Sequence, residues 1–285
     1  SNRPGTVGVK TMSSDCVEQG QYTSAEMMII ATARQVRDGE STIVGMGPPL
    51  LSAALAKYHH APNMWYCTES GPLDWIPTSR ELPAPLGIAD HSLTQGAALS
   101  GDMVDALGAF VNGGWAQSAV LQAAQIDRFG NLNTMLAGTF EDPTRRLPGT
   151  GGNADIGASV QRVISTMPLE TRRFKERADF RTTAGYIDGP GGRSDAGLAP
   201  QGPNRCATNM CVFGFDTEDG GVTGSCEMVL EELFPGVALE EVQAIVPWDL
   251  KVSRDLIYAD PPTREELDLV RHLDDGGNHL IPGRY

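Results

Sequence analysis

A strand–helix–strand pattern decides the fold of this chain, and residues 41–71 carry it: STIVGMGPPLLSAALAKYHHAPNMWYCTESG. The short apolar runs at 41–44 and 64–68 predict buried strands, and the run at 50–58 between them predicts a helix. Strands joined by such a crossover pair in parallel. In open parallel sheets ligands bind beyond the carboxyl ends of the strands. The glycine–proline loop after the first strand and the turn after the second would therefore face the same site.

Similar patterns recur along the rest of the chain. A capping box, Thr23-Ser24-Ala25-Glu26, begins a predicted helix that runs to about Arg37, just before Gly39. The segments 73–95 and 185–205 are rich in turn residues. We expect the first to be a surface loop over the site and the second to be a long irregular excursion. The other expected elements are helices at 102–110 and 264–273, strands at 118–124, 132–136 and 162–167, a hairpin turn at 125–131 and a hairpin between strands at 211–215 and 222–228.

These elements predict an α/β fold, with an open, mostly parallel sheet, flanking helices and added β-hairpins. A chain of 285 residues removes enough surface from water to form a core without a metal ion or a disulfide. We expect residues 1–22 to be a flexible N-terminal tail and residues 23–285 to form a single domain.

The charge balance narrows the class of ligand. Lys and Arg number 22 against 36 Asp and Glu, a formal charge of −14, and a field of that sign repels nucleic acid. An anionic small ligand would need local Arg or Lys side chains or backbone N–H groups. The five cysteines have neither CxxC spacing nor an even count, which argues against a zinc site and a disulfide framework. No apolar run approaches the roughly 18–20 residues of a membrane span, so we expect a cytoplasmic protein without a membrane partner.

Glu69 is the residue that first suggests chemistry. It stands in Cys67-Thr68-Glu69-Ser70-Gly71, where an apolar run gives way to a Ser-Gly turn. A glutamate there can be a nucleophile, although a lone glutamate at a strand end is more often an ordinary surface residue. Two glycine loops, GMGPP at 45–49 and GTGGNAD at 149–155, offer bare backbone that can lie close to a ligand. Together the three segments suggest acyl transfer.

The order of several motifs resembles a known family. GMGPP at 45–49 and Glu-Ser-Gly at 69–71 are followed by AAQIDRFGNLN at 123–133 and GTGGNAD at 149–155. DGPGGR at 188–193 and FGFD at 213–216 fit the same pattern. In this order they are similar to the β subunit of class I CoA-transferases, in particular those of the glutaconate type. The resemblance covers about residues 23–275, which is nearly the whole chain.

The resemblance implies roles for individual residues. Glu69 matches the family's covalent nucleophile, which carries CoA as a glutamyl thioester in a ping-pong reaction. The glycine loops would stabilise the oxyanion or hold CoA, and further residues would form the acyl pocket. For Ser70 a turn-forming role is the competing interpretation, and for the two amides it is a hairpin tie. The residues assigned are Gly45, Gly47, Gly151, Gly152 and Asn153 for the oxyanion and CoA, and Ser70, Gly71, Gln125 and Asn133 for the acyl pocket.

The family also implies a partner, an α subunit of similar fold, with the active site between the two subunits and a hetero-oligomer such as α2β2 or α4β4. A CoA thioester would be a substrate, and no permanently bound cofactor or metal is expected. Arg145-Arg146 and Arg172-Arg173 are the local candidates for the CoA phosphates or a subunit contact. Because this chain departs from the family pattern at Pro48, Pro49 and around Trp75, the substrate acids do not carry over.

Two alternatives stay open at this point. The first is an acyl-CoA hydrolase or a ring-opening C–C hydrolase on the same fold, in which water takes the place of the acceptor acid. The second is a non-catalytic ligand-binding subunit, since related open α/β folds also serve as binding modules.

Overall fold

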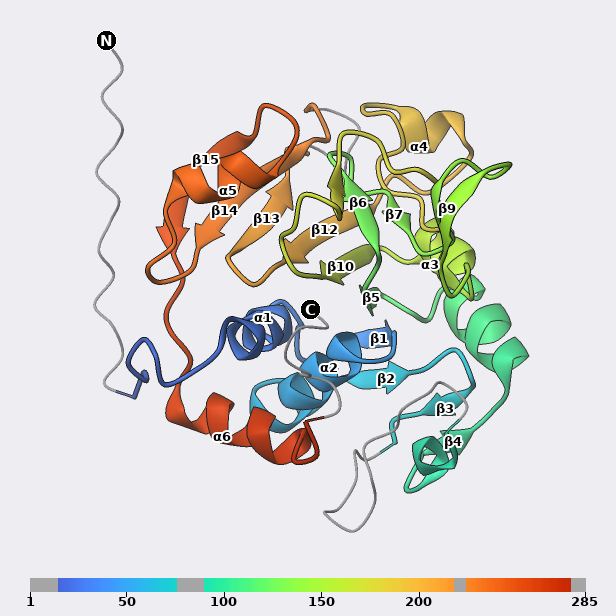
Figure 1. Cartoon of the computed structure of the whole chain (residues 1–285). Helices are drawn as coiled ribbons and strands as arrows, with labels where there is room; N and C mark the ends of the chain where they lie inside the picture. The colour runs from blue at the N-terminus through green and yellow to red at the C-terminus, as the bar shows by residue number, and fades with distance from the viewer. Residues whose placement is uncertain (1–14, 76–89, 218–223, 278–285) are drawn as a thin grey trace.

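A large mixed sheet forms the centre of the molecule (Figure 1). The computed structural model describes residues 15–75, 90–217 and 224–277. The inner strands pair in parallel, and antiparallel strands are added at both sides, which confirms the predicted open α/β fold. In spatial order the strands are β15 (Lys251–Tyr258), β14 (Met228–Leu233), β13 (Cys211–Phe215), β12 (Gly202–Ala207), β10 (Arg162–Thr166), β5 (Ser118–Leu121), β1 (Ser41–Val44), β2 (Trp65–Cys67), β3 (Pro72–Leu73) and β4 (Leu99–Ser100).

Helices and two small sheets cover the large sheet. A three-stranded sheet has the order β11 (Phe174–Lys175), β6 (Gln125–Asp127) and β7 (Leu132–Asn133), and a hairpin pairs β8 (Leu136–Gly138) with β9 (Pro143–Arg146). The helices are α1 (Ser24–Ala33), α2 (Pro48–His59), α3 (Asn153–Ser159), α4 (Gly192–Asp195), α5 (Leu239–Ile245) and α6 (Arg264–Leu273), with a 3-10 helix η1 (His91–Thr94) and a π-helix η2 (Val104–Asn112).

The central strands are buried on both faces. Val44, Val120 and Ile164 belong to one apolar cluster, together with side chains of α1, α2 and α6. Their neighbours Ile43 and Leu121 belong to a second cluster, to which the small sheet, α3 and α5 contribute. Successive residues of a strand point to opposite faces, so strands covered on both sides become continuous apolar runs. This double burial explains why the sequence shows runs instead of alternation.

Helices α1 and α6 are joined by two reciprocal ion pairs. Each helix begins with a capping box, and the box glutamates are Glu26 in α1 and Glu266 in α6. Arg271 of α6 donates to Glu26 at 2.7 Å, and Arg34 at the end of α1 donates to Glu266 at 2.7 Å. The box carboxylates therefore both stabilise a helix terminus and connect the two helices.

Several predicted boundaries are wrong for local reasons. Helix α1 ends at Ala33, short of Arg37, because Gln35 and Val36 donate to carbonyls three residues back and tighten the chain into turns. Helix α2 begins at Pro48, where a proline suits the first helical turn, and not at Leu50. The predicted helix at 102–110 is η2, shifted to 104–112. The predicted helix at 264–273 is confirmed as α6.

The strand predictions differ more. The predicted strand at 132–136 is divided into β7 and β8, because the chain turns where the Asn133 side chain accepts from Met135 N. The antiparallel pairing of β13 with β14 confirms the second hairpin, but β14 begins only at Met228. The excursion predicted at 185–205 contains α4 and the first residues of β12. Strand β15 and helix α5 were not predicted.

Some expectations fall outside the described residues. These are residues 1–14 of the predicted tail, residues 76–89 of the predicted loop over the site, and residues 218–223 of the second hairpin turn. The described part of the tail, 15–22, is packed against the C-terminal region. Val17 is buried and its N–H donates to the carbonyl of Pro262 at 2.9 Å.

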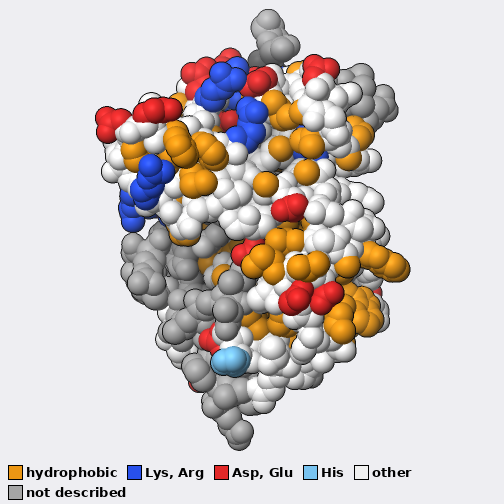
Figure 2. All heavy atoms as spheres, turned by 90° about the vertical axis from the view of Figure 1, so that its right-hand side faces the viewer, with side chains coloured by type: hydrophobic (Ala, Val, Ile, Leu, Met, Phe, Trp, Pro, Cys, Tyr) orange, Lys and Arg blue, Asp and Glu red, His pale blue; other side chains and the backbone are white. Residues whose placement is uncertain are grey.

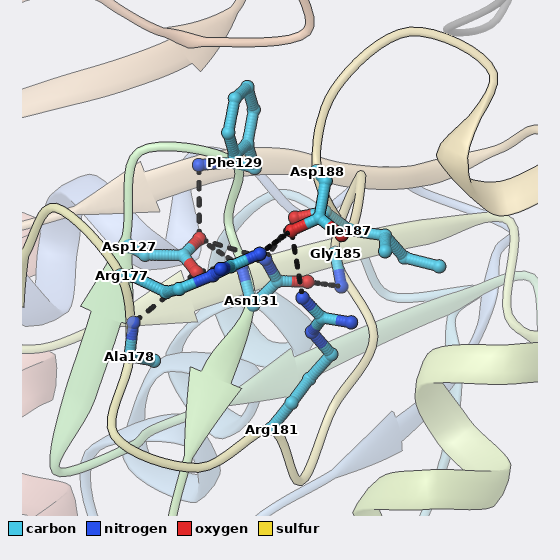
Figure 3. A network of polar contacts seen from close by, with 9 residues as sticks. All are labelled: Asp127, Phe129, Asn131, Arg177, Ala178, Arg181, Gly185, Ile187 and Asp188. Carbon is cyan, nitrogen blue, oxygen red and sulfur yellow. Dashed lines mark hydrogen bonds and ion pairs between the residues drawn. The ribbon is translucent and has the colours of Figure 1, made fainter.

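A buried carboxylate organises the hairpin between β6 and β7 (Figure 3). Asp127 accepts hydrogen bonds from the backbone N–H groups of Phe129 and Asn131, both at 3.0 Å, and from the Asn131 amide. Asn131 in turn donates to the carbonyl of Ile187 and accepts from Gly185 N. Burial raises the pKa of the Asp127 carboxyl, and hydrogen bonds from Asn131 oppose that shift. The conspicuous motif at 125–131 thus holds two loops together.

Candidate functional site

Glu69 lies at the tip of a tight turn directly after β2. The turn is closed by the N–H of Gly71, which donates to the carbonyl of Thr68 at 3.0 Å. Gly71 has a φ of +114°, and a Cβ there would lie 2.2 Å from the carbonyl oxygen of Gly101. Only glycine fits this position. The turn therefore presents Glu69 at the carboxyl end of β2, where ligands bind in sheets of this kind.

A glycine loop meets the Glu69 carboxylate. The N–H of Gly152 donates to Oε2 of Glu69 at 2.7 Å. A Cβ on Gly151 would lie 3.2 Å from both carboxylate oxygens, and one on Gly152 would lie 2.8 Å from Oε2. The absence of side chains at these two positions allows the backbone to approach the carboxylate. Two segments that the sequence singled out separately are thus brought into contact.

A pocket of about 450 Å³ opens beside this contact. Its walls come from the carboxyl ends of β1 and β5, the turn at Glu69, the glycine loop before α3 and the segment that precedes β11. The lining residues are Ile43, Val44, Gly45, Met46, Glu69, Leu121, Gln122, Ala123, Ala124, Thr134, Pro148, Gly149, Thr150, Gly151, Asn153, Ile156 and Arg173.

Some of the residues predicted for the oxyanion and CoA line this pocket. Gly45, Gly151 and Asn153 do so, and the Asn153 amide donates to the hydroxyl of Thr134 at 3.1 Å. Gly152 contacts Glu69 through its N–H. Gly47 is not among the lining residues. It precedes α2 with a φ of +79°, a conformation that glycine adopts without strain.

The four residues predicted for the acyl pocket lie outside the pocket lining. Ser70 forms a hydrogen bond with the hydroxyl of Thr68 at 3.0 Å, and Gly71 serves the turn. The Asn133 amide donates to Oε1 of Gln125 at 2.7 Å, and Gln125 donates to Asp179 at 2.7 Å. These contacts match the competing interpretation, in which Ser70 forms the turn and the two amides tie the hairpin.

Arg173 was predicted only as one member of an arginine pair, yet it lines the pocket. Its side chain is 13% exposed, and its Nη1 donates to the carbonyl of Ala123 at 3.2 Å. Arg172 beside it is 64% exposed. Arg145 and Arg146 lie on β9 and are also exposed. The signal for Arg173 in the sequence was an arginine pair in an acidic chain, which does not say which arginine faces inward.

The described ranges contain no group of three or more His, Cys, Asp or Glu side chains placed to hold a metal ion. In the same part of the chain, no helix combines the length and the apolar character needed to cross a membrane.

Comparisons with known proteins agree with the motif order. A family model described as coenzyme A transferase matches residues 25–244. The chain is 32% identical over 253 residues to the β subunit of 3-oxoadipate CoA-transferase from Pseudomonas knackmussii, covering 89% of this chain and 94% of the relative. It is 31% identical over 265 residues to the β subunit of glutaconate CoA-transferase from Acidaminococcus fermentans, covering 91% and 95%.

A solved structure shows the same fold. Glutaconate coenzyme A-transferase from Acidaminococcus fermentans matches with a TM-score of 0.81 and 29% identity, over 90% of this chain and 96% of that one. The resemblance predicted from the motifs is therefore confirmed at the level of family and fold.

Proposed function

Because this chain belongs to the coenzyme A transferase family, we propose that it is the β subunit of a two-subunit CoA-transferase in which Glu69 carries CoA as a covalent thioester. The observation that carries this proposal is the position of the Glu69 carboxylate, on the wall of a pocket and within hydrogen-bond distance of a glycine N–H. A carboxylate in such a place can attack a bound thioester.

The proposed reaction consists of two matched halves. The Glu69 carboxylate attacks the thioester carbonyl of the donor, which releases the CoA thiolate and leaves a mixed anhydride. The thiolate then attacks the glutamyl carbonyl, the donor acid leaves as a carboxylate, and a glutamyl-CoA thioester remains. The carboxylate of a second acid attacks this thioester, and the same steps run in reverse to give the new acyl-CoA and restore Glu69. Covalent catalysis of this kind divides one difficult exchange into easier steps and gives ping-pong kinetics.

The glycine loop supplies the electrostatic part of the proposal. Each attack places negative charge on a carbonyl oxygen next to the Glu69 side chain. Backbone N–H groups held in place before the reaction stabilise such an oxyanion, because no reorganisation is needed as the charge develops. Gly152 N already points at a carboxylate oxygen of Glu69 at 2.7 Å. We propose that this N–H, and the backbone of Gly151 beside it, have that role.

Exposed apolar side chains beside the pocket support a partner subunit. Val104 is 75% exposed and Trp115 is 73% exposed, and Leu99 and Met103 next to them are also exposed. We call these four residues the η2 patch. Figure 2 views this side of the molecule, on which hydrophobic side chains gather. Exposed apolar groups of this kind mark interaction sites.

The η2 patch is connected to the catalytic glutamate. Helix η2 also contains Leu107, whose Cδ2 is so close to Gly152 that a Cβ there would lie 2.7 Å from it. A partner that covered the η2 patch would therefore lie beside the loop that contacts Glu69. We propose that the α subunit binds there and completes the active site.

A trapping experiment tests the chemistry. The chain, assembled with its α subunit, is incubated with an acyl-CoA and then treated with hydroxylamine or borohydride, and the modified peptide is identified by mass spectrometry. We expect modification at Glu69 only when acyl-CoA is present, and none in Glu69→Gln. Release of free acid and CoA without an acceptor and without a trapped glutamyl ester would instead favour the hydrolase alternative.

A second readout separates an enzyme from a binding subunit. Glu69→Gln keeps the size of the side chain, so we expect it to assemble with the α subunit while the transferase kcat falls on the order of 10³-fold or more. An unchanged biological output in cells carrying Glu69→Gln would favour the non-catalytic alternative.

A further inference from the structure

Arg173 brings a positive charge into the pocket that contains Glu69. Among the residues that line this pocket, all of them in the described part of the chain, Glu69 and Arg173 are the two with a charged side chain. The other lining residues are apolar, hydroxyl, amide or glycine residues. A pocket built only for an uncharged acyl chain would not need the cation, because burying an arginine side chain carries a desolvation cost.

The backbone and side chain of Arg173 are held in place. Its N–H donates to the carbonyl of Glu170 at 2.8 Å, and its carbonyl accepts from Ile126 N at 2.9 Å. The guanidinium donates to Oε2 of Glu170 at 3.1 Å and to the carbonyl of Ala123 at 3.2 Å. A planar guanidinium ordered in this way loses little further entropy when it binds an anion.

The charges around Arg173 leave a local excess of positive charge. Glu170 pairs with Arg172 at 2.6 Å and with Arg173 at 3.1 Å, so a single carboxylate faces two arginines. The chain as a whole carries −14, and Glu69 places a carboxylate in the same pocket. A second carboxylate would be repelled from such a pocket unless a local cation received it, and Arg pairs well with carboxylates.

We propose that Arg173 binds a second carboxylate of the acid that exchanges CoA, so that the enzyme prefers dicarboxylic to monocarboxylic acids. One carboxyl group of the acid reacts at Glu69, and the other pairs with Arg173 across the pocket. This inference rests on the proposed function, because it takes Glu69 as the group that carries CoA. It assigns substrate selectivity to a residue of the β subunit.

The test compares two acceptors with the same number of carbon atoms, glutarate and valerate. The assembled enzyme is supplied with acetyl-CoA or glutaryl-CoA as donor, and kcat/KM is measured for each acceptor. We expect wild type to prefer glutarate. In Arg173→Gln we expect the ratio of kcat/KM for glutarate to that for valerate to fall about 10- to 100-fold.

Two further variants define what the change means. Arg173→Lys keeps the charge, so part of the preference should return. Arg172→Gln is the matched control, because Arg172 shares the Glu170 carboxylate but is largely exposed, and its preference should equal that of wild type.

Other outcomes would overturn the inference. Equal losses for both acids, with a raised KM for the CoA donor, would mean that Arg173 binds a phosphate of CoA. Equal losses with a lowered Tm would mean that Arg173 only supports the fold. Normal transfer with an unchanged acid preference would sink this inference alone. A wild-type enzyme that transfers CoA to no acid at all would overturn the proposed function together with it.

Discussion

The backbone N–H of Gly152 donates a 2.7 Å hydrogen bond to Oε2 of Glu69, across 83 residues of sequence. Glu69 follows β2, whereas Gly152 immediately precedes α3. The close approach depends on glycine, because any side chain at 152 would meet both the carboxylate and Leu107. The contact joins the proposed nucleophile to a fixed donor.

Gly152→Ala should impair catalysis while the protein remains folded. The new Cβ would lie 2.8 Å from Glu69 Oε2 and 2.7 Å from Leu107 Cδ2, so the carboxylate must move away from the N–H. Loss of one aligned oxyanion donor typically lowers kcat by about 10²–10³-fold. Steady-state kinetics of the assembled enzyme measures this. Gly108→Ala on η2 is the control, since its Cβ would make only an ordinary contact at 3.7 Å; an equal effect of both variants would contradict the prediction.

Val104→Asp should weaken assembly with the α subunit. Val104 is 75% exposed, so a charge there leaves the isolated chain folded but would be buried without a partner in the complex. We expect the dissociation constant to rise by at least about tenfold. Co-purification and analytical ultracentrifugation measure it. The control is Tyr258→Asp on β15, at the opposite edge of the sheet. Normal assembly of Val104→Asp would place the interface elsewhere.

Glu266→Gln should destabilise the protein near neutral pH and have little effect in acid. Burial favours the protonated form of Glu266, but the hydrogen bonds and charge of Arg34 outweigh it and hold the pKa of the carboxyl below its ordinary value of 4.5. A lowered folded-state pKa contributes stability above the ordinary pKa, and that stability is lost as the pH falls through the folded-state value.

The loss at pH 7 should be about 1.5–3 kcal/mol, as for hydrogen bonds to charged groups. Urea unfolding at pH 7 and at pH 3.5–4.5 measures the difference. Glu265→Gln is the control, because the Glu265 side chain is 79% exposed. A loss of the same size at every pH would contradict the assignment.

Asp127→Asn should destabilise the hairpin between β6 and β7. An amide nitrogen cannot accept the hydrogen bonds that Asp127 receives from Phe129 and Asn131. Each buried donor left without a partner costs about 1–3 kcal/mol. Thermal unfolding measures the effect. Asp188→Asn, in the same network but 58% exposed, should cost less than about 1 kcal/mol. If the two variants were equally stable, Asp127 would not organise the hairpin.

The position of Glu69 was predictable from sequence because it depends on local signals. Apolar runs at 41–44 and 64–68 fold into β1 and β2, and parallel pairing of the two places the following turn at the ligand-binding edge. The same holds for α6, whose ends follow from its capping box and amphipathic pattern. The order of the glycine motifs then sufficed to indicate the family.

Local patterns did not indicate how distant segments would meet. Strand β12 lies in a segment rich in glycine and proline, and it forms a strand because β10 and β13 pair with it on either side. Gln125 and Asn133 were assigned to a pocket because of their motif, yet folding turns them toward each other and toward Asp179. A polar side chain takes whichever partner tertiary packing brings within reach.

The sequence by itself determined the family, the parallel βαβ unit and the carboxylate that the chemistry requires, because these depend on residue types and spacings along the chain. Only the tertiary structure decided that Gly152 contacts Glu69 and that Arg173, rather than Arg172, faces the pocket. The reason is physical. Contacts between residues far apart in sequence depend on how sheets and loops pack, and neighbouring residues of one type differ only in the direction that packing gives their side chains.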